Sequence, residues 1–341
     1  MNNNTIIIFK NDAVGDLVHS VNAIINLIKK NKDTKIILYL SERSESFKFI
    51  FDYKNIEVKK INYNLTIVEK INIFYFLLFN KISKIYILAP KNYYYYLPFF
   101  FKKIKFYSIC INGINNYKRP NQFLRNYLFK YKINDRGVAF KRESTKSLQQ
   151  KLIAENDFDN FDFKIKLNIS NQLKQFLPKR YIYFHLKKKI FDELGWGLNE
   201  LDILFKNFNK RHQNIVLTKD IEIDENTTVF KKKFNAYDFK TEIFINNNSN
   251  VTFFDNIEGE NLYNVIKYSD KVVAFHGMMT NLASLEKKPV LDLFYCKINS
   301  WEDYRKYRNS FYEFKPKYPN YNFIIPKKDI SKTINKIKFF I

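Results

Sequence analysis

The segment from Tyr268 to Phe294 constrains the fold more than any other part of this chain. Two short apolar runs within it, 271–275 and 289–294, have the length and composition of buried parallel strands. Between them, His276-Gly277 interrupts the first run, and Thr280–Glu286 has the composition of a helix. Parallel strands joined by a helix form open α/β sheets, whose ligands bind beyond the carboxyl ends of the strands. The segment therefore predicts a ligand-binding strand–helix–strand unit.

Polar residues gather at the carboxyl end of the first strand in this unit, where His276, Gly277, Thr280 and Asn281 follow one another closely. Gly277 allows the backbone to approach a ligand, and the first amides of the helix can bind a phosphate or a sugar hydroxyl. We expect His276 to hydrogen-bond a ribose, a phosphate or a sugar. The alternative is an ordinary strand-to-helix turn in which Thr280 only caps the helix.

A similar pattern begins the chain. Thr5–Phe9 is rich in β-branched and aromatic residues and predicts a strand, and residues 10–16 predict a loop that contains Gly15. Apolar residues then recur at helical spacing from Leu17 to Lys30, and Ile36–Leu40 predicts the next strand. Such alternation favours a parallel sheet with helices on both faces.

The alternation loosens between Asn156 and Pro178 and restarts with a predicted strand at Tyr181–His185. A chain of 341 residues is also long enough for two domains of roughly 150 residues each. We therefore expect an α/β protein with two Rossmann-like domains that face each other across a cleft. The expected boundaries are 1–170 for the first domain, 178–326 for the second, and 327–341 for a C-terminal helix that can pack back on the first domain.

The net charge and the cysteine content exclude fewer classes of function than the sequence motifs do. The formal net charge of +24 attracts anions such as nucleic acid, acidic lipid or phosphorylated sugar, without selecting among them. Lys, Asn, Ile, Phe and Tyr are all abundant while Gly is rare, which is typical of AT-rich coding bias and weakens the charge argument. Neither the two cysteines nor the four histidines have metal-ligand spacing, so no metal is predicted and a reducing cytoplasm is expected.

Two interpretations of the aromatic stretch Tyr93–Tyr107 stay open. The first is a buried helix and strand. The second is a surface patch of aromatic side chains edged by Lys102, Lys103 and Lys105, a pattern typical of interfacial contact with a membrane. No apolar run reaches the roughly 20 residues of a membrane-spanning helix.

Three segments resemble glycosyltransferase family 9, the lipopolysaccharide heptosyltransferases. Residues 6–24, IIIFKNDAVGDLVHSVNAI, resemble the N-terminal signature of that family, in which a strand runs into a Gly-Asp turn and an apolar helix. Residues 181–220 are similar to the start of the family's second domain. The segment 268–294 occupies the place of the donor-binding strand and helix, although His276-Gly277-Met278 replaces the usual Asp-Ser/Thr-Gly.

The resemblance implies a fold of the GT-B type and transfer of a sugar, without a metal, from a nucleotide-sugar donor. The implied acceptor is an anionic, lipid-linked glycan, either lipopolysaccharide core or a related surface glycan. Peripheral contact with an anionic membrane is implied as well, on the inner face of the cytoplasmic membrane. No nucleic-acid partner is implied.

Sugar transfer needs a base for the acceptor hydroxyl and positive groups for the departing diphosphate. We predict Asp16 as the base, with Asp12 as the alternative; Asp16 is otherwise a carboxylate that stabilises a helix N-terminus. The remaining candidates are donor-binding residues at strand ends, namely His185, Lys187, Lys188, Lys189, Thr218, His276, Gly277, Thr280 and Asn281. Two rival hypotheses remain at this stage, a basic nucleic-acid-binding protein and a catalytically silent sugar-binding relative.

Overall fold

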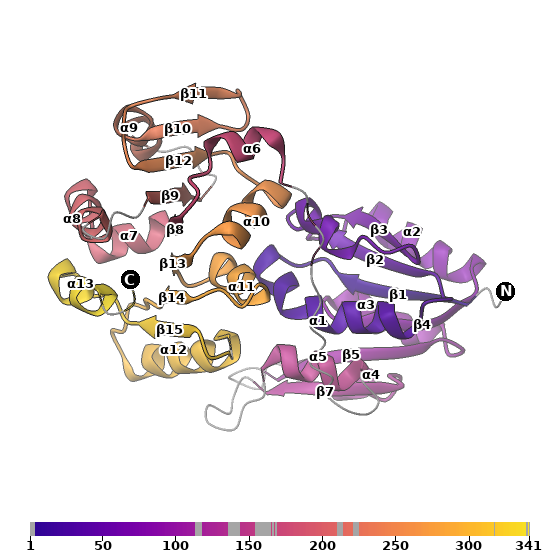
Figure 1. The fold of residues 1–341 in the computed structure, drawn as a ribbon. Coiled ribbons are helices and arrows are strands. Elements are labelled where there is room, and N and C mark those ends of the chain that lie inside the picture. Colours follow the sequence, from indigo (N-terminus) through magenta and orange to yellow (C-terminus); the bar gives the residue numbers. More distant parts are fainter. Residues whose placement is uncertain are drawn as a thin grey trace. The chain divides into compact units, whose positions relative to one another are not determined.

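The computed structural model describes residues 4–112, 118–135, 144–153, 165, 167, 169–209, 214–220, 225–316, 318–338 and 340. The chain divides into two compact units, which are shown in Figure 1. The first unit comprises Met1–Phe163 and Ser300–Lys315, and the second comprises Lys164–Asn299 and Pro316–Ile341. Both units are α/β with predominantly parallel sheets, which confirms the predicted fold class.

The sheet of the first unit has the strand order β3-β2-β1-β4-β5-β6, and β7 also pairs with β5. The pairing of β5 with β6 is antiparallel, and the others are parallel. The strands are β1 (Thr5–Lys10), β2 (Ile36–Ser41), β3 (Ile56–Ile61), β4 (Ile82–Ile87), β5 (Lys105–Asn112), β6 (Lys118–Arg119) and β7 (Lys130–Asp135). The helices are α1 (Val14–Lys30), the 3-10 helix η1 (Glu45–Phe51), α2 (Ile67–Phe79), α3 (Asn92–Phe100), α4 (Gln122–Arg125), α5 (Thr145–Ile153) and α12 (Trp301–Phe314).

The helices of the first unit use the two faces of its sheet. Buried side chains of α2 and α3, among them Ile73 and Tyr94, share one core with Ile7 and Phe9 of the central strand. Helices α1 and α5 pack against each other. The alternating apolar residues of β1 serve both faces at once, as a central parallel strand requires.

The sheet of the second unit has the strand order β11-β10-β12-β9-β8-β13-β14-β15. The pairing of β10 with β11 is antiparallel, and the others are parallel. The strands are β8 (Tyr181–Leu186), β9 (Asn214–Lys219), β10 (Asn235–Asp238), β11 (Ile243–Ile245), β12 (Val251–Asp255), β13 (Lys271–Phe275), β14 (Val290–Leu293) and β15 (Tyr321–Ile324). The helices are α6 (Asn171–Phe176), α7 (Lys188–Leu194), α8 (Leu198–Asn209), α9 (Glu225–Lys233), α10 (Gly259–Tyr268), α11 (Met278–Leu285) and α13 (Ile330–Lys338).

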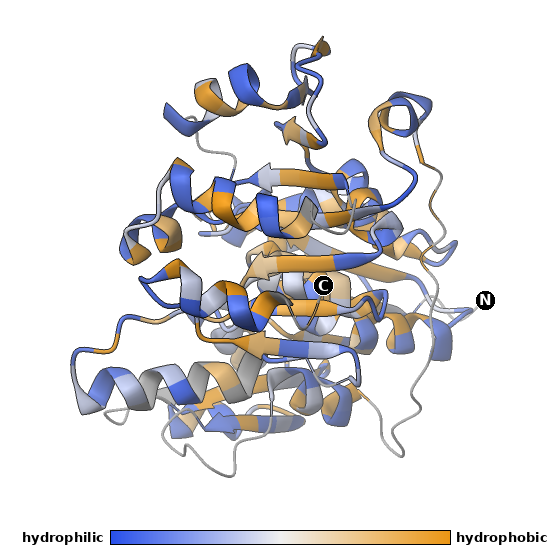
Figure 2. Cartoon of the chain, turned by 60° about the vertical axis from the view of Figure 1, so that its left-hand side comes forward, coloured by the Kyte–Doolittle hydropathy of each residue, from blue (hydrophilic) through white to orange (hydrophobic). Residues whose placement is uncertain are grey.

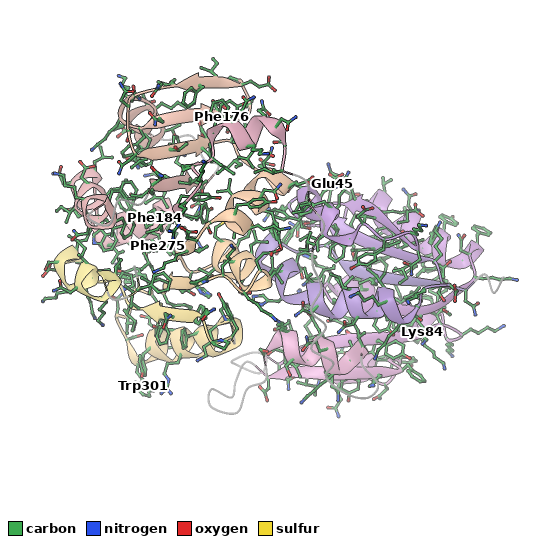
Figure 3. The ribbon with its side chains drawn as sticks, viewed as in Figure 1. Glu45, Lys84, Phe176, Phe184, Phe275 and Trp301 are labelled. Atoms are coloured by element: carbon green, nitrogen blue, oxygen red, sulfur yellow. The ribbon has the colours of Figure 1, made fainter. Side chains whose placement is uncertain are left out.

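The core of the second unit is rich in aromatic residues. Phe184 of β8 and Phe275 of β13, both labelled in Figure 3, are buried in it together with Trp196. Figure 2 shows that hydrophobic residues fill the strands, whereas the helices alternate between hydrophobic and hydrophilic patches. Each helix can therefore cover the sheet with one side and face water with the other.

The C-terminal helix differs from our expectation. Ile330, Ile334 and Ile337 of α13 recur at helical spacing and join the core of the second unit. The structure thus places this helix on the second unit rather than on the first. The late segment that groups with the first unit is Ser300–Lys315, which carries α12.

The loop that we expected at residues 10–16 is also shorter in the structure. Helix α1 already begins at Val14, so Gly15 and Asp16 lie in its first turn rather than in a preceding loop. The N-cap residue Ala13 makes no side-chain hydrogen bond to the helix, and a Cβ added at Gly15 would meet nothing within 4 Å. There is therefore open space at the Gly15 Cβ position, and the N-cap side chain does not cap α1.

Parts of the aromatic stretch Tyr93–Tyr107 fit each of the two interpretations. Tyr94, Tyr95 and Tyr107 are buried, as the core interpretation expects. Tyr96 and Phe100 are exposed, with accessible fractions of 53% and 61%. Helix α3 therefore has a buried face and an exposed aromatic face, and the exposed aromatics form only part of the stretch.

Candidate functional site

The strand order of the second unit defines where a ligand is expected. From β8 the sheet extends through β9 in one direction and through β13 in the other, so the order of the strands reverses between β8 and β13. Ligands of open α/β sheets bind beyond the carboxyl ends of the strands at such a reversal. His185 lies opposite Ala274 in the register of these two strands, which brings the His185 and His276 segments to the same sheet edge.

The turn after β13 is held in shape by the helix that follows it. Gly277 has a φ of +154°, a conformation that L side chains rarely adopt. The Thr280 hydroxyl donates to the Gly277 carbonyl oxygen over 3.0 Å, and Asn281 Nδ2 donates to the same oxygen over 2.9 Å. Thr280 and Asn281 are buried, so they shape the turn from within, as the capping alternative expected.

His276 is oriented by a buried carboxylate that the sequence analysis did not identify. Its Nδ1 lies 2.6 Å from Oδ2 of Asp292, and the Tyr321 hydroxyl donates to the same oxygen over 2.7 Å. The Asp292 side chain is fully buried, whereas the His276 ring keeps 16% of its surface exposed. Because a carboxylate only accepts hydrogen bonds, Nδ1 of His276 is the donor in this pair. Nε2 is then the ring nitrogen left for a ligand.

The end of β8 carries a second histidine in a polar chain. His185 Nδ1 lies 2.9 Å from the Thr218 hydroxyl, which also lies 2.6 Å from the Tyr183 hydroxyl. Nε2 of His185 lies 3.4 Å from Oδ1 of Asp220, so both ring nitrogens have protein partners. Burial raises the pKa of Asp220, but the His185 hydrogen bond and the charges of His185 and Lys187 outweigh it and leave this pKa lowered. His185 and Thr218 are both buried and link the ends of β8 and β9 to each other.

The three lysines after β8 separate in the structure. Lys187 Nζ lies 3.5 Å from the His276 carbonyl oxygen and would lie 3.6 Å from a Cβ at Gly277. Lys188 pairs with Asp192 on the next turn of α7 over 3.0 Å, and Lys189 is exposed. Of these three cations, Lys187 is the one placed at the His276-Gly277 turn.

In the first unit, the two candidate carboxylates have different surroundings. Asp16 is exposed on the first turn of α1. Asp12 is 8% exposed, and its Oδ2 accepts from the buried Lys10 ammonium over 2.8 Å. Asp12 is held in a buried ion pair whereas Asp16 is exposed to solvent, so accessibility favours Asp16 over Asp12 as the carboxylate that an acceptor hydroxyl can reach.

Further cations lie near Asp12. Lys91 Nζ lies 3.6 Å and Arg43 Cζ 4.4 Å from the centre of the Tyr63 ring, which is a cation–π arrangement. Burial lowers the pKa of Lys91, and Arg119, Lys10 and Arg43 lower it further against the opposing charge of Asp12. Several positive groups thus lie near Asp12, and one of them, Arg43, also lies 3.9 Å from a Glu42 carboxylate oxygen. A cluster in which cations outnumber carboxylates attracts anions.

Comparison with known proteins supports the fold. No family model matches the sequence, and no curated protein matches it significantly. Among solved structures, a family 9 glycosyltransferase from Veillonella parvula superimposes with a TM-score of 0.65 at 11% identity, covering 100% of this chain and 93% of that one. The E. coli heptosyltransferase WaaC with ADP gives 0.59 at 13% identity, covering 99% and 96%. The UDP-GlcNAc 2-epimerase from Methanocaldococcus jannaschii gives 0.54 at 14% identity, covering 98% and 91%.

This chain therefore has the two-unit α/β fold of family 9 glycosyltransferases, the GT-B type expected from the sequence. Enzymes with different reactions share this fold, because the similar structures include a transferase and an epimerase. What their names have in common is a nucleotide-linked sugar or its nucleotide.

The residues that sequence reasoning missed are buried or distant in sequence. Asp292 is an acid in the otherwise apolar run VLDLF, and this contrast was the available signal. Asp220 directly follows β9 in the structure, and its place shortly after an apolar run was a weaker signal. The sequence around Tyr321 and Lys91 does not identify them as site residues. Only the order of the strands in the sheets brings them to these sites.

Proposed function

We propose that this protein is a glycosyltransferase that moves a sugar from a nucleotide-sugar donor to an anionic, lipid-linked glycan of the lipopolysaccharide-core type. The observation that carries this proposal is the turn at the β8/β13 reversal, where the Lys187 ammonium lies beside the His276 carbonyl oxygen and the Gly277 backbone. The fold supports it, because the similar structures act on nucleotide-linked sugars or bind their nucleotide.

In this proposal the donor binds to the second unit. The Lys187 ammonium neutralises the diphosphate, and the absence of a side chain at Gly277 allows a phosphate to approach the backbone. Nε2 of His276 hydrogen-bonds a phosphate, ribose or sugar oxygen, while Asp292 fixes the ring. These positive and dipolar groups stabilise the charge that develops on the leaving nucleoside diphosphate.

Asp16 acts as the general base. Its exposed carboxylate removes the proton of the acceptor hydroxyl as that oxygen forms the new glycosidic bond. The bond between the sugar and the diphosphate breaks, and its electron pair leaves with the nucleoside diphosphate. The cations around Asp12 favour a negatively charged acceptor near this end of β1.

We further propose that transfer needs no metal, since Lys187 and the backbone supply the positive groups that a metal ion would otherwise supply. The chain would work in the cytoplasm, peripherally on the inner face of the membrane that carries its acceptor. Among the described helices, none is long and apolar enough to cross a bilayer.

The test is release of nucleoside diphosphate from ADP-, UDP- and GDP-linked sugars, measured with and without deacylated lipopolysaccharide core and with a chelator present. The proposal expects acceptor-dependent release from at least one donor that persists with the chelator. Binding of nucleotide without release would indicate a silent sugar-binding relative. Salt-sensitive binding of oligonucleotides without any response to nucleotides would indicate the nucleic-acid hypothesis.

A further inference from the structure

Helix α2 exposes more large apolar side chains than it buries. Of its residues, all of which the structure describes, Ile73 and Leu77 are buried. The exposed ones form a stripe along the outer side of the helix, and Ile67 and Phe79 at its two ends are 74% and 77% exposed. The full stripe is Ile67, Val68, Ile71, Tyr75, Leu78 and Phe79. A helix whose only task is to cover a sheet would show polar residues on this side.

The stripe continues over the neighbouring helices. The Phe74 ring of α2 lies 5.7 Å from the Phe100 ring of α3, and Phe100 lies 5.4 Å from Phe99. Phe99 in turn lies 5.3 Å from Tyr127, which follows α4. The exposed side chains Tyr96, Phe99, Phe100 and Phe123 therefore extend the stripe sideways. We call this joint surface of α2, α3 and α4 the apolar face.

The segment that carries α2 and α3 is strongly basic. Residues 67–105 contain seven lysines and a single acid, Glu69. The Glu69 carboxylate accepts hydrogen bonds from the Thr66 and Asn62 backbone amides at the start of α2. Lys81, Lys102, Lys103 and Lys105 are exposed where the helices end. Lys84, labelled in Figure 3, lies opposite Lys105 in the register of the neighbouring strands β4 and β5.

We propose that the apolar face is a docking surface for an anionic lipid bilayer, with α2 lying in the interface and the lysines at its rim contacting headgroups. Interfacial helices combine an apolar side that enters the headgroup–acyl boundary with cations that attract anionic lipid. Exposed Tyr and Phe side chains suit the same boundary.

Charge complementarity selects the bilayer over a second copy of this chain. Two copies joined through this face would bring lysine rims together, and Glu69 is the only acid in residues 67–105 that could pair with them. Like charges placed together across an interface disfavour association. The biological role of this surface rests on the proposed function, because a lipid-linked acceptor has to be reached at a membrane. The physical argument for membrane binding does not depend on which donor the protein uses.

The test is flotation of the full-length protein with phosphatidylcholine vesicles that contain or lack phosphatidylglycerol. We expect binding to the anionic vesicles only. The apolar variant Ile67→Ser/Ile71→Ser/Leu78→Ser should lose that binding with an unchanged melting temperature, because these side chains are exposed. Reversal of Lys81, Lys102 and Lys103 to Glu should lower the partition coefficient by roughly 100-fold or more, since each lysine near such a surface adds about 1 kcal/mol.

Matched controls change equally exposed residues of the second unit. Ile203→Ser/Ile243→Ser/Ile298→Ser removes three exposed isoleucines, and Lys174→Glu/Lys206→Glu/Lys336→Glu makes the same change in net charge. Both controls should float like the wild type. Equal losses in test and control variants would overturn the proposal, as would full binding by the apolar variant or a concentration-dependent dimer that this variant abolishes. Nucleotide binding by the same variants, measured by calorimetry, should stay unchanged. This measurement tests the proposed function separately from membrane binding.

Discussion

Single side chains decide how each candidate site can act, and Asp16 is the simplest to test. It is exposed in the first turn of α1, where a carboxylate contributes about 0.3–1 kcal/mol to a helix, so Asp16→Asn should lower the melting temperature only slightly. Turnover should fall by roughly 10²-fold or more, the usual effect of losing a general base. Nucleoside diphosphate release measures it, and Asp33→Asn, which changes another exposed aspartate of the same unit, is the control. Activity of Asp16→Asn within about twofold of wild type would remove Asp16 from the mechanism.

Asp12 should behave in the opposite way. Its carboxylate pairs with Lys10, whose side chain is 2% exposed, so Asp12→Asn leaves a buried ammonium without its counter-charge. Removal of one partner of a buried ion pair costs about 3–5 kcal/mol. We expect urea denaturation to show a loss of about 3 kcal/mol, and the double variant Lys10→Met/Asp12→Leu to recover much of it. A stable Asp12→Asn protein would mean that this pair does not hold the end of β1.

Two variants at the Asp292–His276 contact can distinguish a role in positioning the His276 ring from a role in stability alone. Asp292→Asn offers Nδ1 of His276 a weaker and less defined partner, so affinity for nucleoside diphosphate should fall roughly 10-fold, equivalent to about 1.4 kcal/mol. Tyr321→Phe keeps the carboxylate for His276 and should cost about 1 kcal/mol of stability with affinity nearly unchanged. Calorimetry and denaturation distinguish the two variants. Equal affinity losses would show that the network acts only through stability.

At the scale of elements, one lysine joins a helix to two strands of the second sheet. Lys231 of α9 lies 2.7 Å from Asp238 at the end of β10 and 2.8 Å from Asp255 at the end of β12. Burial raises the pKa of Asp238, but hydrogen bonds from Lys231 and Asn256 outweigh it, so the net pKa is well below the usual range. A carboxyl whose folded pKa is depressed stabilises the fold above its unfolded pKa near 3.9, and that contribution is lost as pH falls further.

Asp238→Asn should therefore flatten the acid side of the stability profile. The melting temperature of the wild type is expected to fall as the pH drops from about 4 to about 2, and the variant should lose less over the same interval. Asp52→Asn, at an exposed position of the first unit, should follow the wild type. Parallel curves for the wild type and Asp238→Asn would show that the contact with Lys231 does not stabilise the folded state.

Elements with strong local patterns were predictable from sequence, and those shaped by tertiary contacts were not. The strands at Thr5–Lys10 and Lys271–Phe275 lie where their apolar runs predicted them. The sequence over 122–131 is compatible with a single helix, yet α4 ends at Arg125 and Lys130–Asp135 pairs with β5 instead. Likewise, His276 was identified as the first polar residue after a strand, whereas its partner Asp292 lies one strand further in the sheet. Local periodicity carries no record of which strands become neighbours.

At the scale of the whole molecule, the two units have separate hydrophobic cores, one around Phe9 and one around Phe184. The side chains that hold the candidate donor site, among them Lys187, His276 and Asp292, all belong to the second unit. Each core can unfold cooperatively, so calorimetry should resolve two transitions. A nucleoside diphosphate that binds only the folded second unit should then stabilise one of them.

The expected shift corresponds to about 2.7 kcal/mol at a ligand concentration of 100 times the dissociation constant. Lys187→Ala should reduce the shift caused by a nucleoside diphosphate more than the shift caused by the nucleoside, because only the former carries charge for the ammonium to meet. Lys189→Ala, which removes an exposed neighbour, should respond like the wild type. If the ligand moves both transitions equally, or if Lys187→Ala weakens nucleoside and nucleoside diphosphate alike, the diphosphate does not bind at the His276-Gly277 turn.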